Sequence, residues 1–122
     1  DRELGIMDMD IYDIESIYQS PVNIDKAGRL DYGGSQMTHA MVFTGVNLDD
    51  DGKPTRWRVE NSWGDDFADK GFMLMSDGWF DEYNYEVVVD KKYLSEELLG
   101  IYSGDPIGLP PWDPMGALAR AI

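Results

Sequence analysis

Cysteine is absent from all 122 residues of the chain, and this absence limits its chemistry more than any residue that is present. Without a thiol, the chain can form neither a disulfide framework nor a thiolate metal site. It also cannot, by itself, carry out a reaction that begins with attack by its own thiolate. A chain without cysteine is compatible with a reducing compartment.

Positive charge and long apolar runs are also scarce. The chain has 10 basic and 24 acidic residues, which gives a net charge of −14. This balance disfavours binding to nucleic acid or to an anionic membrane, because both attract Lys and Arg. No stretch approaches the ~20 apolar residues that span a bilayer, and the start Asp1-Arg2-Glu3 does not resemble a signal peptide. We therefore expect no nucleic acid and no membrane as partner, and interpret the charge mainly as a source of solubility.

What the chain does contain is enough apolar surface for one domain. Hydrophobic residues make up 43% and aromatic residues 12%, which argues against disorder. Runs of strands with a few short helices predict an α+β fold with a twisted antiparallel sheet or a partly closed barrel. Strands are expected at residues 37–46, 55–61, 71–75 and 85–89. Helices are expected at 10–19, 77–83 and 91–99, and a loop at 22–36.

Capping residues set the expected ends of these helices. Asp8 or Asp10 is available as the N-cap of the first helix, and Gly100 is expected to stop the last one. The pair Gly33-Gly34 permits a left-handed backbone or a close approach just before the first long strand. It could serve as an ordinary loop hinge or help to shape a cleft.

The only histidine, His39, and Asn61 stand out as candidate functional residues. His39 lies at the start of one β-rich run and Asn61 at the end of the next. An antiparallel hairpin would bring these two positions together, because the chain doubles back between them. An asparagine oxygen can accept the imidazole N–H and so fix the tautomer and direction of a general base. Trp63 would lie close enough to cover the pair.

The turn between the two runs matches the first half of a calcium-binding loop. The pattern is Asn47-x-Asp49-x-Asp51-Gly52, but Arg58 occupies the twelfth position, where a bidentate Glu is needed. The motif also belongs between helices rather than strands. An acidic hairpin turn is the better account, and calorimetric titration with calcium would test it.

Three segments together resemble one branch of the papain-like cysteine peptidases. They are Met37-Thr38-His39-Ala40-Met41, Trp57-Arg58-Val59-Glu60-Asn61-Ser62-Trp63-Gly64, and Leu109-Pro110-Pro111-Trp112-Asp113-Pro114-Met115-Gly116-Ala117-Leu118-Ala119. This combination resembles the bleomycin hydrolase / aminopeptidase C family, and the likeness extends over nearly the whole chain. The resemblance implies the β-rich half of a papain-like fold, which faces a helical half that carries the catalytic cysteine.

The resemblance also implies a function for the intact protein. The chain would be the C-terminal portion of a cytoplasmic cysteine aminopeptidase, a homo-hexamer that needs no cofactor and acts on peptides with a free N-terminus. His39 would be the catalytic base and Asn61 its orienting residue. Trp63 would shield their hydrogen bond from water. The nucleophilic cysteine would lie upstream of the present residues, so this chain alone should be inactive.

The end of the chain is the second functional element that the resemblance implies. Residues 104–122 would form an extended arm, separate from a peptidase part over 1–103. In the family this arm occupies the active-site cleft, and its terminal carboxylate holds the substrate's amino group. Ala117, Leu118 and Ala119 match the family's end, but Arg120-Ala121-Ile122 follow here. Three extended residues span about 10 Å, which would displace that carboxylate unless they are trimmed or coiled back.

A different class of function also fits the residues. The chain could be a stand-alone, non-catalytic acidic β-domain that keeps the peptidase scaffold as a binding module. A Gln…Cys-Trp block encoded upstream of Asp1 would distinguish the enzyme from this alternative. The resemblance further implies a missing strand before Asp1, so we expect the chain alone to be poorly stable or to self-associate.

Overall fold

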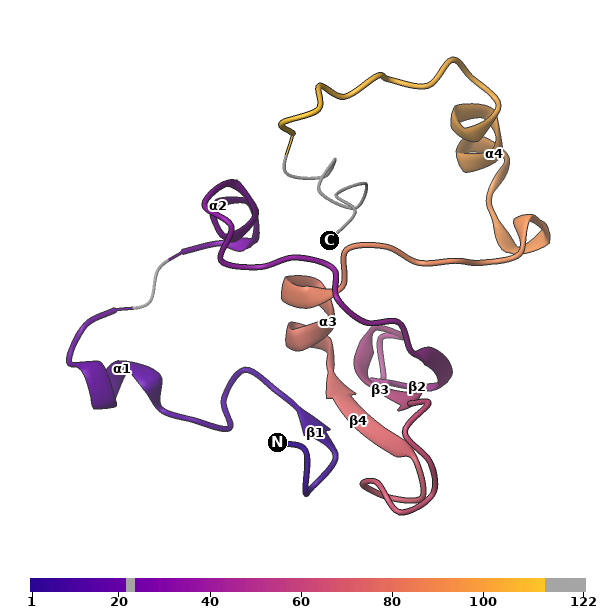
Figure 1. Ribbon diagram of the computed structural model, residues 1–122. Helices are drawn as coiled ribbons and strands as arrows, with labels where there is room; N and C mark the ends of the chain where they lie inside the picture. The colour runs from indigo at the N-terminus through magenta and orange to yellow at the C-terminus, as the bar shows by residue number, and fades with distance from the viewer. Residues whose placement is uncertain (22–23, 114–122) are drawn as a thin grey trace. The chain divides into compact units, whose positions relative to one another are not determined.

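A four-stranded sheet with the order β1-β4-β3-β2 organises the computed structural model, which describes residues 1–21 and 24–113 (Figure 1). Its strands are β1 (Ile6–Met7), β2 (Val42–Leu48), β3 (Pro54–Glu60) and β4 (Phe72–Ser76). The strands β2, β3 and β4 are antiparallel, whereas β1 pairs with β4 in parallel. The α+β prediction is confirmed, with an open, mixed sheet.

Two units make up the chain. The first comprises residues 1–26 and 38–84 and contains the whole sheet. The second comprises residues 27–37 and the chain from residue 85 onward. Among the described residues, none of the helices is long and apolar enough to cross a bilayer.

The β2–β3 hairpin forms as the sequence predicts, but its first strand is shorter. Pairing runs from Val42 opposite Glu60 to Leu48 opposite Pro54 at the turn. The carboxylate of Asp49 accepts hydrogen bonds from the backbone N–H groups of residues 51 and 53, so it holds the turn closed. The predicted start at residue 37 was wrong, because residues 37–41 have no strand partner in the described sheet.

A small core lies against this sheet. Val59 is fully buried, and Met73 and Met75 on β4 are nearly so. The indole of Trp57 stacks on Phe80 at a ring-centroid distance of 4.7 Å, and its N–H donates to the Asp77 carboxylate over 2.8 Å. Both partners belong to helix α3 (Asp77–Tyr83), which forms at the predicted residues. Stacking and hydrogen bond together hold α3 to the sheet.

Truncating the fully buried side chain should destabilise the fold. We expect Val59→Ala to lower the free energy of unfolding by about 2 kcal/mol, through lost apolar burial and the cavity left behind. Chemical denaturation of the purified protein would measure this loss. Val46→Ala is the matched control, since Val46 is 47% exposed on β2 and should change stability far less. Equal losses at both positions would contradict this account of the core.

The first helix, α1 (Ile14–Tyr18), is shorter than the predicted 10–19. Its N-cap is Asp13, not Asp8 or Asp10 as predicted, because the Asp8 carboxylate instead closes a local turn by accepting the N–H of residue 10. Side-chain and backbone hydrogen bonds from Ser16 hold the pKa of the Asp13 carboxyl below its ordinary value. Gln19, with φ 50°, ends the helix in the left-handed conformation.

Helix α2 (Lys26–Asp31) lies where a loop over 22–36 was predicted, so that prediction was wrong. The segment gave no helical signal because it is short and contains an internal glycine. The pair Gly33-Gly34 ends this helix: the N–H groups of Gly33 and Gly34 donate to the carbonyls of residues 30 and 29, respectively. The pair is therefore part of a helix C-cap, and Gly33 has φ 69°.

The remaining helical region is divided into two. A short 3₁₀ helix, η1 (Lys91–Tyr93), precedes α4 (Glu96–Tyr102), in place of a single helix over 91–99. The hydroxyl of Ser95 accepts the N–H of residue 98 and so begins a new helix. Gly100 does not stop α4 but lies inside it. The strand predicted at 85–89 is absent, because this segment has no pairing partner among the described residues.

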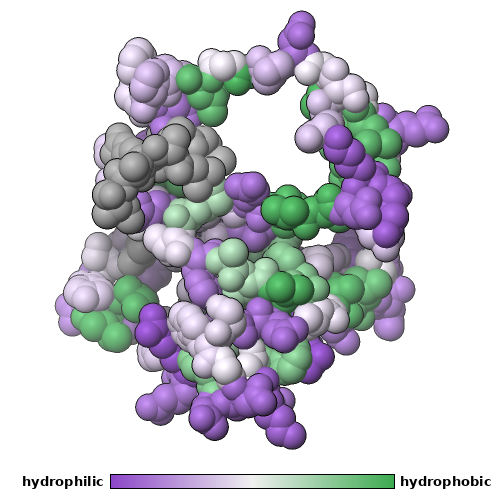
Figure 2. All heavy atoms as spheres, turned by 45° about the vertical axis from the view of Figure 1, so that its right-hand side comes forward, coloured by the Kyte–Doolittle hydropathy of each residue, from purple (hydrophilic) through white to green (hydrophobic). Residues whose placement is uncertain are grey.

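The strand β2 is one of the two edge strands of the sheet, the other being β1, and all seven of its residues are exposed. Four of them are large and apolar: Val42, Phe43, Val46 and Leu48. Figure 2 shows that hydrophobic residues, in green, lie at the surface among hydrophilic ones in purple. An apolar edge with unpaired backbone groups is a template for pairing with another strand.

The exposed edge leads to a prediction about the isolated chain. We expect its melting temperature to rise with protein concentration, because association would cover the edge and stabilise the folded state. Scanning calorimetry over a wide range of concentrations, together with sedimentation velocity, would measure this. A monomer with a high, concentration-independent melting temperature would contradict the prediction.

Candidate functional site

The two residues singled out from the sequence meet just beyond the end of the β2–β3 pair. His39 precedes β2 by three residues and Asn61 follows β3 directly, and the pairing of Val42 with Glu60 brings them together. The His39 Nε2 and the Asn61 Oδ1 lie 2.8 Å apart. The contact therefore forms beyond the open end of the hairpin, opposite the turn, rather than within the paired strands.

The hydrogen-bond partners of Asn61 define the tautomer of the histidine. The Asn61 Oδ1 also accepts the backbone N–H of Ser62 over 2.8 Å. A backbone N–H can only donate, so this second bond identifies the atom facing it as oxygen. An oxygen can only accept, so Nε2 of His39 carries the proton. A neutral ring in this state has Nδ1 free to take up a proton.

Asn61 itself is held firmly. It is only 7% exposed, the one buried polar residue in the part of the chain that the structure describes. Its backbone N–H donates to the carbonyl of Gly71 over 2.9 Å. His39, in contrast, is exposed. The site thus combines a fixed, buried acceptor with an imidazole whose ring remains accessible.

Trp63 lies beside the imidazole, as the sequence predicts. The two ring centroids are 5.1 Å apart with an angle of 35° between the planes. Phe67 contacts the indole edge-on at 4.7 Å, and sequence reasoning missed it. The four-residue spacing from Trp63 was the available signal, but such spacing has no meaning outside a helix. Trp63 is 47% exposed, so it covers only one side of the histidine–asparagine pair.

The segment from Asn61 to Gly71 contains an unusual number of left-handed residues. Gly64 and Gly71 have φ 87° and 85°, while Ala68 and Lys70 have φ 49° and 53° without being glycine. A Cβ on Gly71 would lie 3.3 Å from the carbonyl oxygen of Gly64, so a larger residue would push this loop outward. Sequence reasoning did not identify Gly71. The recurrence of glycine at both ends of the loop was its only signal.

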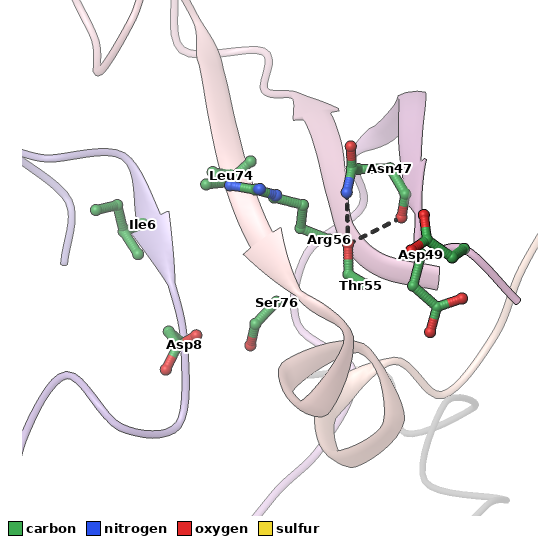
Figure 3. Close-up of a pocket in the computed structure, with 9 residues that line it drawn as sticks. Ile6, Asp8, Asn47, Asp49, Thr55, Arg56, Leu74 and Ser76 are labelled. Atoms are coloured by element: carbon green, nitrogen blue, oxygen red, sulfur yellow. Dashed lines mark hydrogen bonds between the residues drawn. The ribbon is translucent and has the colours of Figure 1, made fainter. Parts of the chain in front are cut away.

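The opposite end of the hairpin contains a cavity of about 590 Å³ (Figure 3). It is lined by Ile6, Asp8, Asn47, Asp49, Asp50, Thr55, Arg56, Leu74 and Ser76. The Asn47 amide donates to the Thr55 hydroxyl over 2.7 Å, as the dashed line in Figure 3 shows. In the described ranges, no three His, Cys, Asp or Glu side chains are grouped to hold a metal ion. The turn remains best described as an acidic hairpin.

The predicted arm residues Ala117, Leu118 and Ala119 lie outside the described residues. The part of the arm that is described, residues 104–113, contains no helix and no strand. The structure therefore brings together His39, Asn61 and Trp63 of the predicted site. The arm's contribution remains a prediction.

The sequence of the chain matches one family of peptidases and several of its members. The sequence profile of the Peptidase C1-like family matches residues 1–116. Aminopeptidase C of Streptococcus thermophilus is 54% identical over 119 residues, which cover 98% of this chain. Human bleomycin hydrolase is 55% identical over 121 residues, which cover 97% of it. The resemblance to the bleomycin hydrolase / aminopeptidase C branch is confirmed.

The comparison with solved structures agrees. The crystal structure of PepW from Lactobacillus rhamnosis HN001 superposes with a TM-score of 0.86 at 53% identity over 96% of this chain. The matched region is 27% of that chain, and likewise 27% of each of the two relatives above. The present chain thus spans about a quarter of the length of the proteins it matches.

Proposed function

The chain belongs to the Peptidase C1-like family, and we propose that it is the C-terminal portion of a cysteine aminopeptidase. It supplies the catalytic base and the residue that orients it, while the nucleophilic cysteine lies in a part of the enzyme outside this sequence. The 2.8 Å contact between His39 Nε2 and Asn61 Oδ1 is the observation that carries this proposal. It holds the ring in the tautomer that leaves Nδ1 able to take a proton.

The chemical steps follow from this arrangement. His39 Nδ1 takes the proton of the cysteine thiol, and the resulting thiolate attacks the carbonyl carbon of the first peptide bond. The imidazolium then donates that proton to the departing amine as the C–N bond breaks, which leaves an acyl-enzyme. Water, deprotonated by the same nitrogen, hydrolyses the thioester and regenerates the thiol. Asn61 keeps the ring oriented through all steps, and Trp63 limits the access of water to their hydrogen bond.

The substrate class rests on the relatives. Their names describe aminopeptidase C and bleomycin hydrolase, which supports peptides with a free N-terminus as substrates of the intact enzyme. The same proposal includes a cytoplasmic location, a hexamer without cofactor, and an arm formed by residues 104–122 of which Ala117–Ala119 approach the substrate. These features come from the family resemblance. The three residues Arg120-Ala121-Ile122 affect the last feature, because they extend the chain beyond the segment proposed to approach the substrate.

A comparison of the chain alone with the complete enzyme tests the proposal. We expect the 122-residue chain to show no cleavage of aminoacyl-arylamides, because it has no cysteine. The enzyme extended upstream to include the cysteine-bearing part should cleave them and lose activity when its thiol is alkylated. Cleavage by the chain alone, or alkylation-insensitive cleavage by the complete enzyme, would refute the mechanism. A complete protein without any peptidase activity would favour a binding module.

A further inference from the structure

The beginning of the chain packs against the loop that follows Asn61. Gly5 is buried, with φ 67°, in the turn that residues 1–6 form before and into β1. A Cβ on Gly5 would lie 2.7 Å from the Cβ of Ala68, closer than two carbon atoms approach without displacement. The carbonyl of Gly5 also accepts the N–H of Leu74 on β4 over 2.8 Å. The turn is therefore anchored to the sheet and seated directly on Ala68.

The residue under this contact adopts a conformation that needs support. Ala68 has φ 49° and Lys70 has φ 53°, a region that residues with a Cβ rarely occupy. Such backbone conformations persist where surrounding structure enforces them, and they are frequent around functional sites. The loop that contains them also carries Trp63 and ends at Gly71, whose carbonyl binds the backbone of Asn61.

A second contact links the same turn to the indole. The guanidinium of Arg2 lies 5.2 Å from the centroid of the Trp63 ring, within the range of a cation–π interaction. The imidazole of His39 lies 5.1 Å from the same ring. Phe67 packs edge-on against the indole, and Trp63 is still 47% exposed. Arg2 therefore limits the positions that the indole can adopt beside the histidine.

We propose that the turn over residues 1–6, which we call the brace, is a positioning element for the catalytic pair of His39 and Asn61. Gly5 fixes the strained loop by its fit against Ala68, and Arg2 fixes the indole of Trp63. Gly5 faces Ala68 in the loop and Arg2 lies over the indole that the loop carries, so both act on the pair through the loop. This inference rests on the proposed function, because it assigns the brace a role in that reaction.

Gly5→Ala in the complete enzyme tests the fit against Ala68. The added methyl must displace the loop, and we expect kcat to fall about tenfold with KM nearly unchanged, since small displacements of catalytic groups cost rate rather than binding. The matched control is Gly52→Ala. Gly52 also has a positive φ, 79°, but an added Cβ there meets no atom within 4 Å. It carries the same kind of backbone strain without the clash.

Rescue separates positioning from a general loss of structure. Ala68→Gly removes the methyl that collides and also suits the left-handed backbone at that position. The double variant Gly5→Ala/Ala68→Gly should recover part of the lost kcat, because the added Cβ still lies 3.3 Å from the carbonyl oxygen of Phe72. Titration of the reactive thiol and thermal melting report the fraction of folded enzyme for every variant.

Substitution of Arg2 is an independent test, because it introduces no steric overlap. We expect Arg2→Ala to lower kcat about threefold without a change in KM, and Arg2→Lys to restore most of it because a lysine also binds an aromatic face. If Gly5→Ala does not fold, the two Arg2 variants test the brace instead. A wild-type kcat for Arg2→Ala overturns the brace in that case, as does equal activity of Gly5→Ala and Gly52→Ala where both fold. An inactive wild-type enzyme would instead refute the proposed function.

Discussion

Replacing His39 by alanine is expected to lower kcat of the complete enzyme about 10³-fold, with little change in KM. The substitution removes the group that takes the thiol proton and later returns it to the leaving amine, and such general acid–base roles contribute roughly 10²–10⁴-fold. Within this chain the ring contacts Asn61 and Trp63, and its proton transfers occur in the transition state rather than on substrate binding, so KM should be nearly unaffected. Steady-state cleavage of an aminoacyl-arylamide would measure both constants.

His39→Gln serves as the companion variant, because glutamine fills part of the space of the ring without acting as a base. We expect both variants to keep their melting temperatures within a few degrees, since His39 is exposed. A tenfold or smaller loss of kcat in the two variants would contradict the assignment of His39 as the base. If a variant also unfolds, titration of the reactive thiol gives the fraction of folded enzyme, and kcat is then calculated for that fraction.

Asn61→Ala should lower kcat by about 10- to 100-fold, the range found when the hydrogen-bond partner that orients a metal-bound imidazole is removed. It should also lower the free energy of unfolding by about 1 kcal/mol, because two N–H donors lose their shared acceptor at a partly buried place. Those donors are Nε2 of His39 and the backbone N–H of Ser62. Activity and chemical denaturation should therefore both be measured.

Two further variants serve as comparisons for the Asn61→Ala measurements. Asn61→Asp keeps an oxygen that accepts both hydrogen bonds, so it should retain more activity than Asn61→Ala. Asn47→Ala is the control for loss of a hydrogen-bonded amide elsewhere, because Asn47 binds Thr55 at the exposed turn. Equal damage by the aspartate and alanine variants at position 61 would show that the shared acceptor is not what matters.

Local pattern explains why the hairpin was predictable from the sequence. An acidic turn between two alternating runs fixes the register, and the register fixes which residues meet beyond its end. The strand expected at 85–89 had the same support from propensity, with Val87, Val88 and Val89 in a row. It did not form, because a strand also requires a partner, and no propensity supplies one. Val88 remains 96% exposed.

Among the helices, too, some were predicted from the sequence and others were missed. The segment 77–83 had Trp79 and Phe80 to bury, and it forms a helix against the sheet. The segment at α2 lacked an apolar face and escaped notice, although a glycine pair marks its end. The division of 91–99 depends on one hydroxyl, that of Ser95, which begins α4. Periodicity does not detect such a residue, but a serine at the N-cap followed by the acidic first turn Glu96-Glu97 could have indicated it.

For the site, the sequence was sufficient for the residues that meet through the hairpin. It was insufficient for those that meet through the irregular loop. The contact of Gly5 with Ala68 joins positions 63 residues apart and depends on positive φ angles at both, so neither spacing nor composition predicts it. Phe67 and Gly71 belong to the same class, since a loop without repeating geometry has no periodic signal.

The shared acceptor on Asn61 has a consequence for how such an enzyme could be assembled. Because the amide is oriented by the N–H of its own neighbour in the chain, the imidazole is directed before any sulfur atom reaches it. Under the proposed function, the histidine is therefore oriented when this chain folds, before the cysteine-bearing part docks. A separately produced cysteine-bearing fragment would need to supply only its thiol at the right place, which makes reconstitution from two polypeptides a matter of surface fit.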